Sequence, residues 1–185
     1  MEDKQTVKFN VYEMKYKGGA IKSNLPLILF NEKYDEQYKN LINDCFYEMR
    51  KALNVRPYKT YGKHSNNLED LTKIKDNTFL LLDVDEIVCA VSFLGNEIEN
   101  VAVNLKYQRR GYGRKLMKFA IGYMQKRKVS PIILTVTEWN KNAIALYKLL
   151  GFEVTKEKTV EGVNAKDADG NWTFAFTETE GLNMR

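Results

Sequence analysis

The sequence predicts a mixed α/β fold in which helices pack on the faces of one central sheet. Three observations carry this prediction. Apolar and polar residues alternate near the N-terminus, apolar residues recur at spacings of three and four after Asp35, and a strand-helix-strand-helix-strand series fills the second half. No repeat, low-complexity tract or linker interrupts the 185 residues, so we expect residues 1–185 to form a single domain.

The first elements follow from these two periodicities. A strand is expected from Thr6 to Tyr16, and Gly18-Gly19 marks a turn before a second strand at Leu25 to Phe30. We therefore expect the chain to open with a hairpin. The amphipathic helix that follows is predicted from an apolar stripe formed by Tyr38, Leu41, Ile42, Cys45, Phe46, Met49 and Leu53.

The middle of the chain contains an expected loop and then antiparallel strands. Pro57 and Gly62 make residues 54–67 the most loop-like stretch of the first half, and we expect a surface loop beside a site there. A short helix is expected over 68–74. Strands joined by tight turns are then expected at Thr78–Val84, Ile87–Leu94 and Glu97–Val103.

The second half begins with the glycine loop Gly111-Tyr112-Gly113. Asn140 is the expected N-cap of the second helix in this half, and Gly151 is expected to end it. Helices are expected at Arg114–Lys126 and Lys141–Leu150, and strands at Ile132–Glu138, Phe152–Val160 and Trp172–Thr177.

The charge is concentrated in one stretch. The chain has 29 Lys and Arg against 24 Asp and Glu, a net charge of +5, yet Leu105 to Lys128 alone holds nine basic residues and no acidic one. The rest of the chain is mildly acidic. This distribution indicates a localised anion site rather than a basic surface.

Several classes of protein are excluded or disfavoured by composition. No apolar run approaches the ~18 residues of a membrane helix, and the polar N-terminus does not resemble a signal peptide, so a cytoplasmic protein without membrane partners is expected. Cys45 and Cys89 lack metal-ligand spacing and are interpreted as buried free thiols. With His64 as the single histidine, no metal site is expected and a Ser-His-Asp triad is disfavoured.

The strongest chemical signal is the loop that links an expected strand to an expected helix, Gln108-Arg109-Arg110-Gly111-Tyr112-Gly113. A helix begins with unpaired backbone N–H groups and a partial positive charge, and glycines let the backbone approach a phosphate closely. The neighbouring arginines, including Arg114, add full charges, so the loop suits a diphosphate. The alternative is a tight turn with surface arginines.

Two other anion-binding loops do not fit. A P-loop requires a Lys-Ser/Thr pair, whereas Arg114-Lys115 follows the second glycine here. The dinucleotide fingerprint requires three glycines after the first strand of a βαβ unit, and this loop has two glycines past the middle of the chain.

Two segments together resemble the GNAT (Gcn5-related) N-acetyltransferases. Val101-Ala102-Val103 and the segment 108–113 resemble that family's Q/R-x-x-G-x-G/A acetyl-CoA loop. Residues 140–152 resemble its N-x-x-A-I-x-L-Y-x-x-x-G-F segment, in the expected order and at the expected spacing. The resemblance is close from about Thr78 to Phe152 and looser outside it.

The resemblance implies a fold and a cofactor site. The sheet would be mostly antiparallel and splayed into a V between its two central parallel strands, Glu97–Val103 and Ile132–Glu138, with acetyl-CoA as co-substrate in the V. The diphosphate would bind backbone N–H groups of Arg109 to Arg114. The pantetheine arm would pair with Val101, Ala102 and Val103, and Asn140 would contact the cofactor.

The resemblance also implies direct acetyl transfer to a primary amine in a ternary complex. Tyr147 matches the tyrosine that protonates the departing thiolate, although its helical position also suits a core aromatic. A backbone N–H around Val101–Val103 would stabilise the oxyanion. The amine needs a base. Glu97 aligns with the base of the histone-acetyltransferase branch, Glu99 shares its face of the strand, and a solvated carboxylate is the alternative for both.

The sequence does not distinguish between two kinds of acceptor, a small-molecule amine and a peptide or protein amine. Thr135 stands where ribosomal-protein alanine acetyltransferases carry a glutamate, which argues against that activity. Side chains that could line the acceptor site are Tyr58, Tyr61, His64, Trp172, Phe174 and Phe176, although the last three also match an ordinary sheet face.

Two other functions and one assembly are compatible with features of this sequence. A GNAT-like acetyl-CoA sensor without catalysis is one alternative. A nucleic-acid binder is more remote, because helical periodicity directs Leu116, Phe119, Ala120 and Tyr123 toward the core. Homodimers are common among GNAT-like proteins, so a homodimer is compatible with the resemblance.

Overall fold

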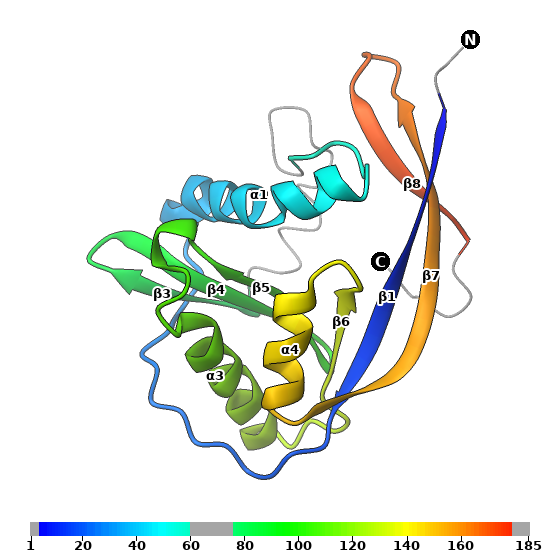
Figure 1. Ribbon diagram of the computed structural model, residues 1–185. Coiled ribbons are helices and arrows are strands. Elements are labelled where there is room, and N and C mark those ends of the chain that lie inside the picture. The colour runs from blue at the N-terminus through cyan, green and yellow to red at the C-terminus, as the bar shows by residue number, and fades with distance from the viewer. Residues whose placement is uncertain (1–3, 60–75, 179–185) are drawn as a thin grey trace.

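The computed structural model describes residues 4–59 and 76–178, and one eight-stranded sheet dominates this part of the chain (Figure 1). The strand order is β2-β3-β4-β5-β6-β1-β7-β8. The strands are β1 (Gln5–Tyr16), β2 (Ile28–Leu29), β3 (Thr78–Asp83), β4 (Glu86–Leu94), β5 (Glu97–Val103), β6 (Ile133–Thr137), β7 (Phe152–Lys166) and β8 (Trp172–Glu178). The α-helices are α1 (Asp35–Ala52), α3 (Tyr112–Lys126) and α4 (Lys141–Leu149), and 3-10 turns lie at Glu32–Tyr34 and Leu105–Tyr107.

Helices cover both faces of the sheet, as the sequence predicts. One core lies between the sheet and α3 and α4, where Leu116, Met117 and Phe152 are buried. The second core lies under α1, where Tyr38 and Leu41 pack against Ala102 of β5. The mixed α/β class with a mostly antiparallel sheet is therefore confirmed.

The expected N-terminal hairpin is wrong. β1 pairs with β6 and β7, whereas the short β2 pairs with β3 at the far end of the sheet. The connection between β1 and β2 instead crosses α3, where the Ile21 N–H donates to Gln125 Oε1 at 2.9 Å. A two-residue period identifies a strand but not its partner, and β1 pairs along both edges with strands from the C-terminal half.

Strand β7 is longer than expected. The sequence predicts an end at Val160, but β7 continues to Lys166 because it pairs with β1 as far as Asn164 and, from Glu161 onward, with β8 on its other edge. The short helix expected over 68–74 lies outside the described residues.

The sheet opens between β5 and β6, its central parallel strands. β5 and β6 pair at one position, Glu97 with Ile133, where the Ile133 N–H donates to the Asn96 carbonyl at 3.0 Å. Beyond that point the strands separate, which is the V that the resemblance implies.

Smaller expectations can also be checked. Cys89 is buried and Cys45 is half-buried, and both are free thiols. Within the described residues, no helix combines the length and the apolar character needed to cross a bilayer.

Candidate active site

The glycine loop leads into the N-terminus of α3. This helix begins at Tyr112, two residues earlier than expected, so Gly113 lies in its first turn. Gly111 is the N-cap with φ +84°, a left-handed conformation that favours glycine. No side chain caps the helix and its first turn contains no acidic residue, whereas in α4 Asn140 Oδ1 accepts from the Ala143 N–H at 3.1 Å. The first turn of α3 therefore offers its backbone N–H groups to an anion.

The residues around this loop are exposed and basic. Arg109, Arg110 and Arg114 are exposed, and Arg109 has φ +60°. Gln108 folds back, so that its Nε2 donates to the Val103 carbonyl at 3.0 Å. Gln108 thus ties the loop to the end of β5, a positioning role that the motif alone did not indicate.

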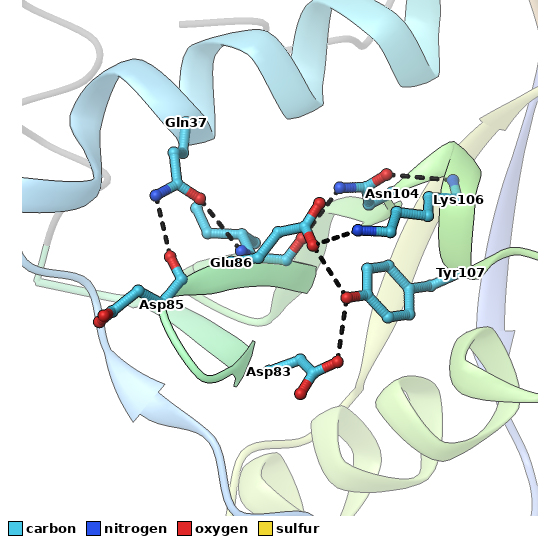
Figure 2. A network of polar contacts seen from close by, with 8 residues as sticks. Gln37, Asp83, Asp85, Glu86, Asn104, Lys106 and Tyr107 are labelled. Atoms are coloured by element: carbon cyan, nitrogen blue, oxygen red, sulfur yellow. Dashed lines mark hydrogen bonds and ion pairs between the residues drawn. The ribbon is translucent and has the colours of Figure 1, made fainter.

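A polar network anchors the segment just before the loop (Figure 2). The Tyr107 hydroxyl lies 3.0 Å from Asp83 Oδ2 and 2.9 Å from Glu86 Oε2, and Lys106 Nζ is 2.6 Å from Glu86 Oε2. Burial and the two carboxylates raise the pKa of Tyr107 to about 12. Since Tyr107 immediately precedes the loop, the β3–β4 turn helps to fix where the loop begins.

The cavity of interest lies at the opening between β5 and β6 and has a volume of about 460 Å³. It brings together residues from five strands, two helices and the segment after α1. From the central strands and the β6–α4 region come Leu94, Glu97, Ile98, Glu99, Asn100, Val101, Leu134, Thr135, Val136, Thr137, Asn140 and Tyr147. From the remaining elements come Phe9, Val11, Phe46, Met49, Arg50, Leu53, Val55, Phe174 and Phe176.

A β-bulge in β5 decides which side chains face which side of this cavity. Ala90 pairs with Ala102, but Ser92 pairs with Glu99, so β5 has one extra residue, and Asn100 has φ +46°. The bulge reverses the alternation of the strand. Val101 packs on the α3–α4 side and Ala102 on the α1 side.

The two carboxylates therefore lie on the α1 side. Glu97 and Glu99 alternate with Ile98, which packs on the α3–α4 side, and the charge of Glu99 acts on Tyr38 of α1. Burial, with added repulsion from Glu97, raises the pKa of the Glu99 carboxyl. A carboxyl whose pKa is raised toward neutrality is better matched to proton transfer than a fully solvated one.

Tyr147 reaches the same cavity from α4. Its ring is buried and packs against Phe152, with 6.1 Å between ring centroids. Burial raises the pKa of Tyr147 to about 12, so the phenol keeps its proton through the neutral range. Tyr147 is thus both a core aromatic and a wall of the cavity, and the two interpretations of this residue are compatible.

The other predicted site residues divide between the cavity and its surroundings. Val101 and Asn140 line it, whereas the Ala102 side chain is buried under α1 and the Val103 side chain packs on the core near α3. Phe174 and Phe176 line it. Trp172 does not, and its ring lies 4.5 Å from the Arg56 guanidinium carbon. Tyr58 meets Tyr47 edge to face outside the cavity lining, and Tyr61 and His64 lie outside the described residues.

Sequence reasoning missed the α1 wall and the bulge. The apolar stripe predicts Phe46 and Met49 as core residues, yet both line the cavity between β5 and β6. Asn100 offered a signal, since asparagine tolerates positive φ better than most residues and is uncommon inside strands.

A larger hollow of about 570 Å³ lies over the network of Figure 2, and its lining includes Asp83, Glu86 and Tyr107. It shares no lining residue with the cavity between β5 and β6. We place the candidate active site in the smaller cavity, because its lining includes the Tyr147 phenol together with the carboxylates of Glu97 and Glu99, at the opening between β5 and β6.

Comparison with known proteins identifies relatives over part of the chain. Residues 36–152 match the model of the Acetyltransferase (GNAT) family. Over 53 residues, or 29% of the chain, the sequence is 47% identical to the [ribosomal protein bS18]-alanine N-acetyltransferase of Escherichia coli K12. The Salmonella typhimurium enzyme of the same name is 45% identical over the same length. The aligned part spans 36% of these relatives' length.

Solved structures share the fold. A putative GNAT acetyltransferase from Novosphingobium aromaticivorans superposes with a TM-score of 0.61 at 17% identity, covering 86% of this chain and 66% of that one. The ribosomal-protein-S18-alanine N-acetyltransferase of E. coli gives 0.51 at 20% identity, covering 86% and 98%. The family model spans more than half of the chain, so this protein belongs to the GNAT acetyltransferase family.

Proposed function

We propose that this protein transfers an acetyl group from acetyl-CoA to a primary amine that attacks directly in a ternary complex. One observation carries the proposal. Residues from both faces of the sheet line a single cavity, with Tyr147 and Asn140 on the α4 side and Glu97 and Glu99 on the α1 side. Donor and acceptor can therefore approach from opposite faces and meet between the strands.

The residues present fit acetyl-CoA, which supplies an activated thioester when bound. The uncapped N-terminus of α3, Gly111 and the exposed arginines would hold its diphosphate. Val101 and the β5 backbone beside the opening would receive the pantetheine arm. A bulge leaves the backbone of its extra residue outside the regular ladder, which makes an N–H near Val101 available to an oxyanion.

Two side chains would move protons. Glu99, whose pKa is raised, would accept a proton from the amine, directly or through water, and Glu97 would assist as its neighbour. Tyr147 would donate its phenolic proton to the departing thiolate. The assignment to Glu99 rather than Glu97 departs from the alignment-based expectation and rests on the raised pKa of Glu99, whose main cause is burial.

The aromatic residues of the basic stretch support this function over nucleic-acid binding. Tyr123 packs within 4.8 Å of Phe93 and 4.9 Å of Phe79, measured between ring centroids, and Phe119 lies 5.5 Å from Phe79. Rings held in this cluster are not available to stack on bases.

Thermal shift followed by a thiol-release assay tests the proposal. Acetyl-CoA at 100-fold excess over its Kd should stabilise the protein by ~2.7 kcal/mol, and CoA thiol should appear when an accepted amine is added. A shift with no thiol release across a broad amine panel would indicate a sensor. Absence of any shift, together with salt-sensitive DNA binding, would overturn the enzyme function.

A further inference from the structure

The α1 side of the cavity has a composition that restricts which amines it can hold. It combines two carboxylates, Glu97 and Glu99, with an extended apolar wall. The apolar wall comes from three separate parts of the chain and includes Phe9, Phe46, Met49, Leu53, Phe174 and Phe176.

Packing contacts hold several side chains of the apolar wall in fixed positions. Phe174 and Phe176 meet edge to face with 4.9 Å between ring centroids, and the Phe174 ring occupies the space that a Cβ at Gly162 would need. On the opposite side, Met49 Sδ accepts a 3.3 Å bond from the Thr137 hydroxyl, which fixes this side chain against β6. A planar apolar group entering here would replace water on aromatic and thioether surfaces.

The charges allow one ammonium group and disfavour an anion. An ammonium beside Glu97 and Glu99 relieves the repulsion between the two carboxylates. The carboxylate of an α-amino acid, whose carbon is two bonds from the ammonium nitrogen, would be brought toward the same negative charges. Among the described residues of the lining, Arg50 is the one cation, so the two carboxylates outnumber it; its Nε donates to the Pro57 carbonyl at 2.7 Å.

The apolar wall disfavours acceptors with several charges. A polyamine or an aminoglycoside would place its further ammonium groups against Phe46, Met49 and the β8 phenylalanines. Burying an ion without a partner costs several kcal/mol. A hydrophobic body with a single amine satisfies both parts of the cavity.

On this basis we propose that the acceptor is a small hydrophobic monoamine, of the arylalkylamine type, whose ammonium group meets Glu97 and Glu99 and whose apolar body lies against the wall formed by α1, β1 and β8. The inference rests on the proposed function, because it assigns the acceptor of that reaction. It goes beyond the relatives' activity, since those relatives are named for an alanine of a ribosomal protein as acceptor.

Matched amines test the inference through binding as well as turnover. The probes are 2-phenylethylamine, L-phenylalanine, which adds one carboxylate, L-phenylalaninamide, which mimics a peptide N-terminus, and spermidine, which adds charges and removes the ring. Each is titrated into the full chain by calorimetry, with and without saturating CoA, and then assayed for thiol release with acetyl-CoA. We expect 2-phenylethylamine to bind at least tenfold more tightly than phenylalanine or spermidine, and to give the highest kcat/KM.

The outcomes separate the inference from the proposed function. Turnover of spermidine or phenylalanine in preference to 2-phenylethylamine would overturn the inference and leave the acetyltransferase function intact. Preference for phenylalaninamide over 2-phenylethylamine would also overturn it, in favour of a peptide acceptor. Failure of 2-phenylethylamine to bind in either state counts against the inference, whereas binding without thiol release or an acetyl-CoA shift counts against the function alone.

A variant pair checks that the apolar wall is responsible. Phe174→Ser should raise the Kd of 2-phenylethylamine about tenfold and leave the Kd of acetyl-CoA unchanged. Leu149→Ser removes a comparable apolar side chain from the exposed face of α4, outside the cavity, and should change neither constant. Equal effects of the two substitutions would contradict a role for the β8 wall.

Discussion

The two sides of the cavity are built in different ways. The α3–α4 side comes from two short motifs, residues 101–113 and 140–152, whose functional atoms are backbone N–H groups and one tyrosine. The α1 side draws Phe9, Met49, Glu99 and Phe176 from elements spread over most of the chain. In the proposed function, the co-substrate is held by local, recognisable sequence, whereas the acceptor is selected by side chains from elements that lie far apart in the chain, whose arrangement Figure 1 shows.

Removing the phenolic hydroxyl of Tyr147 should cause the largest loss of activity. Tyr147→Phe keeps the buried ring but deletes the proton donor, so kcat should fall by roughly 10³-fold, about 4 kcal/mol, with little change in the Kd of acetyl-CoA. Tyr16→Phe is the control, because Tyr16 packs on the same Phe152 with 5.3 Å between centroids and lies outside the cavity lining. Equal kcat values for the two variants would remove the acid role from Tyr147.

Asn164 should show how far the acceptor side depends on tertiary contacts. This fully buried side chain on β7 accepts from the Arg56 N–H at 2.9 Å and donates to the Asn54 carbonyl at 2.6 Å, which pins the end of α1. Asn164→Leu leaves both backbone groups without this partner and should cost about 2–4 kcal/mol, measured as the free energy of unfolding in urea.

The acceptor side should suffer more than the cofactor side in this variant. Amine KM should rise while the acetyl-CoA Kd stays within about twofold, since the glycine loop is held by different contacts. Asn142→Leu, on the exposed surface of α4, serves as the control for adding a leucine. An unchanged amine KM in Asn164→Leu would mean that the two hydrogen bonds of Asn164 serve stability alone.

Glu99 should display a conflict between function and stability. Because its pKa is raised in the fold, ionised Glu99 reduces stability, and this cost is absent at low pH and appears as pH rises from the ordinary carboxyl value through the raised value. Glu99→Gln should therefore raise Tm at pH 7 but not at pH 4, while kcat/KM falls by roughly 10²-fold.

Two further glutamines sharpen this prediction. Glu97→Gln should lower kcat/KM less than Glu99→Gln, and Glu153→Gln, on an exposed part of β7, should alter neither activity nor Tm. A larger loss of activity in Glu97→Gln would restore the base role to Glu97, as the alignment with the histone-acetyltransferase branch expects.

The smallest expected effect is that of a substitution in the glycine loop, which separates a loss of cofactor binding from a general loss of stability. Gly111→Ala places a Cβ at φ +84°, which should cost about 1–2 kcal/mol of stability and also weaken acetyl-CoA binding. Gly95→Ala carries similar strain at φ +57° in the β4–β5 turn, where space around the Cβ is likewise open. Only the first substitution should change the acetyl-CoA Kd in calorimetry, and a change in both would assign the effect to global destabilisation.

The sequence by itself determined the parts of the site whose chemistry is local. The glycine loop, the Asn140 cap, Tyr147 and most element boundaries were predictable, because capping, helical periodicity and backbone N–H geometry depend on residues a few positions apart. The paired carboxylates were also predictable, since Glu97 and Glu99 lie two residues apart on one strand.

Only the tertiary structure decided the rest. Alternation did not reveal that β1 pairs with β6 and β7, because hydrogen-bond partners along a strand are not encoded by its own period. The bulge at Asn100 reversed the faces of β5, the V exposed Phe46 and Met49 to the cavity, and the burial of Glu99 beside Glu97 set its proton affinity. Each of these features depends on which distant segments pack together and bury side chains away from water. Such packing is a property of the assembled sheet and helices rather than of any single stretch of chain.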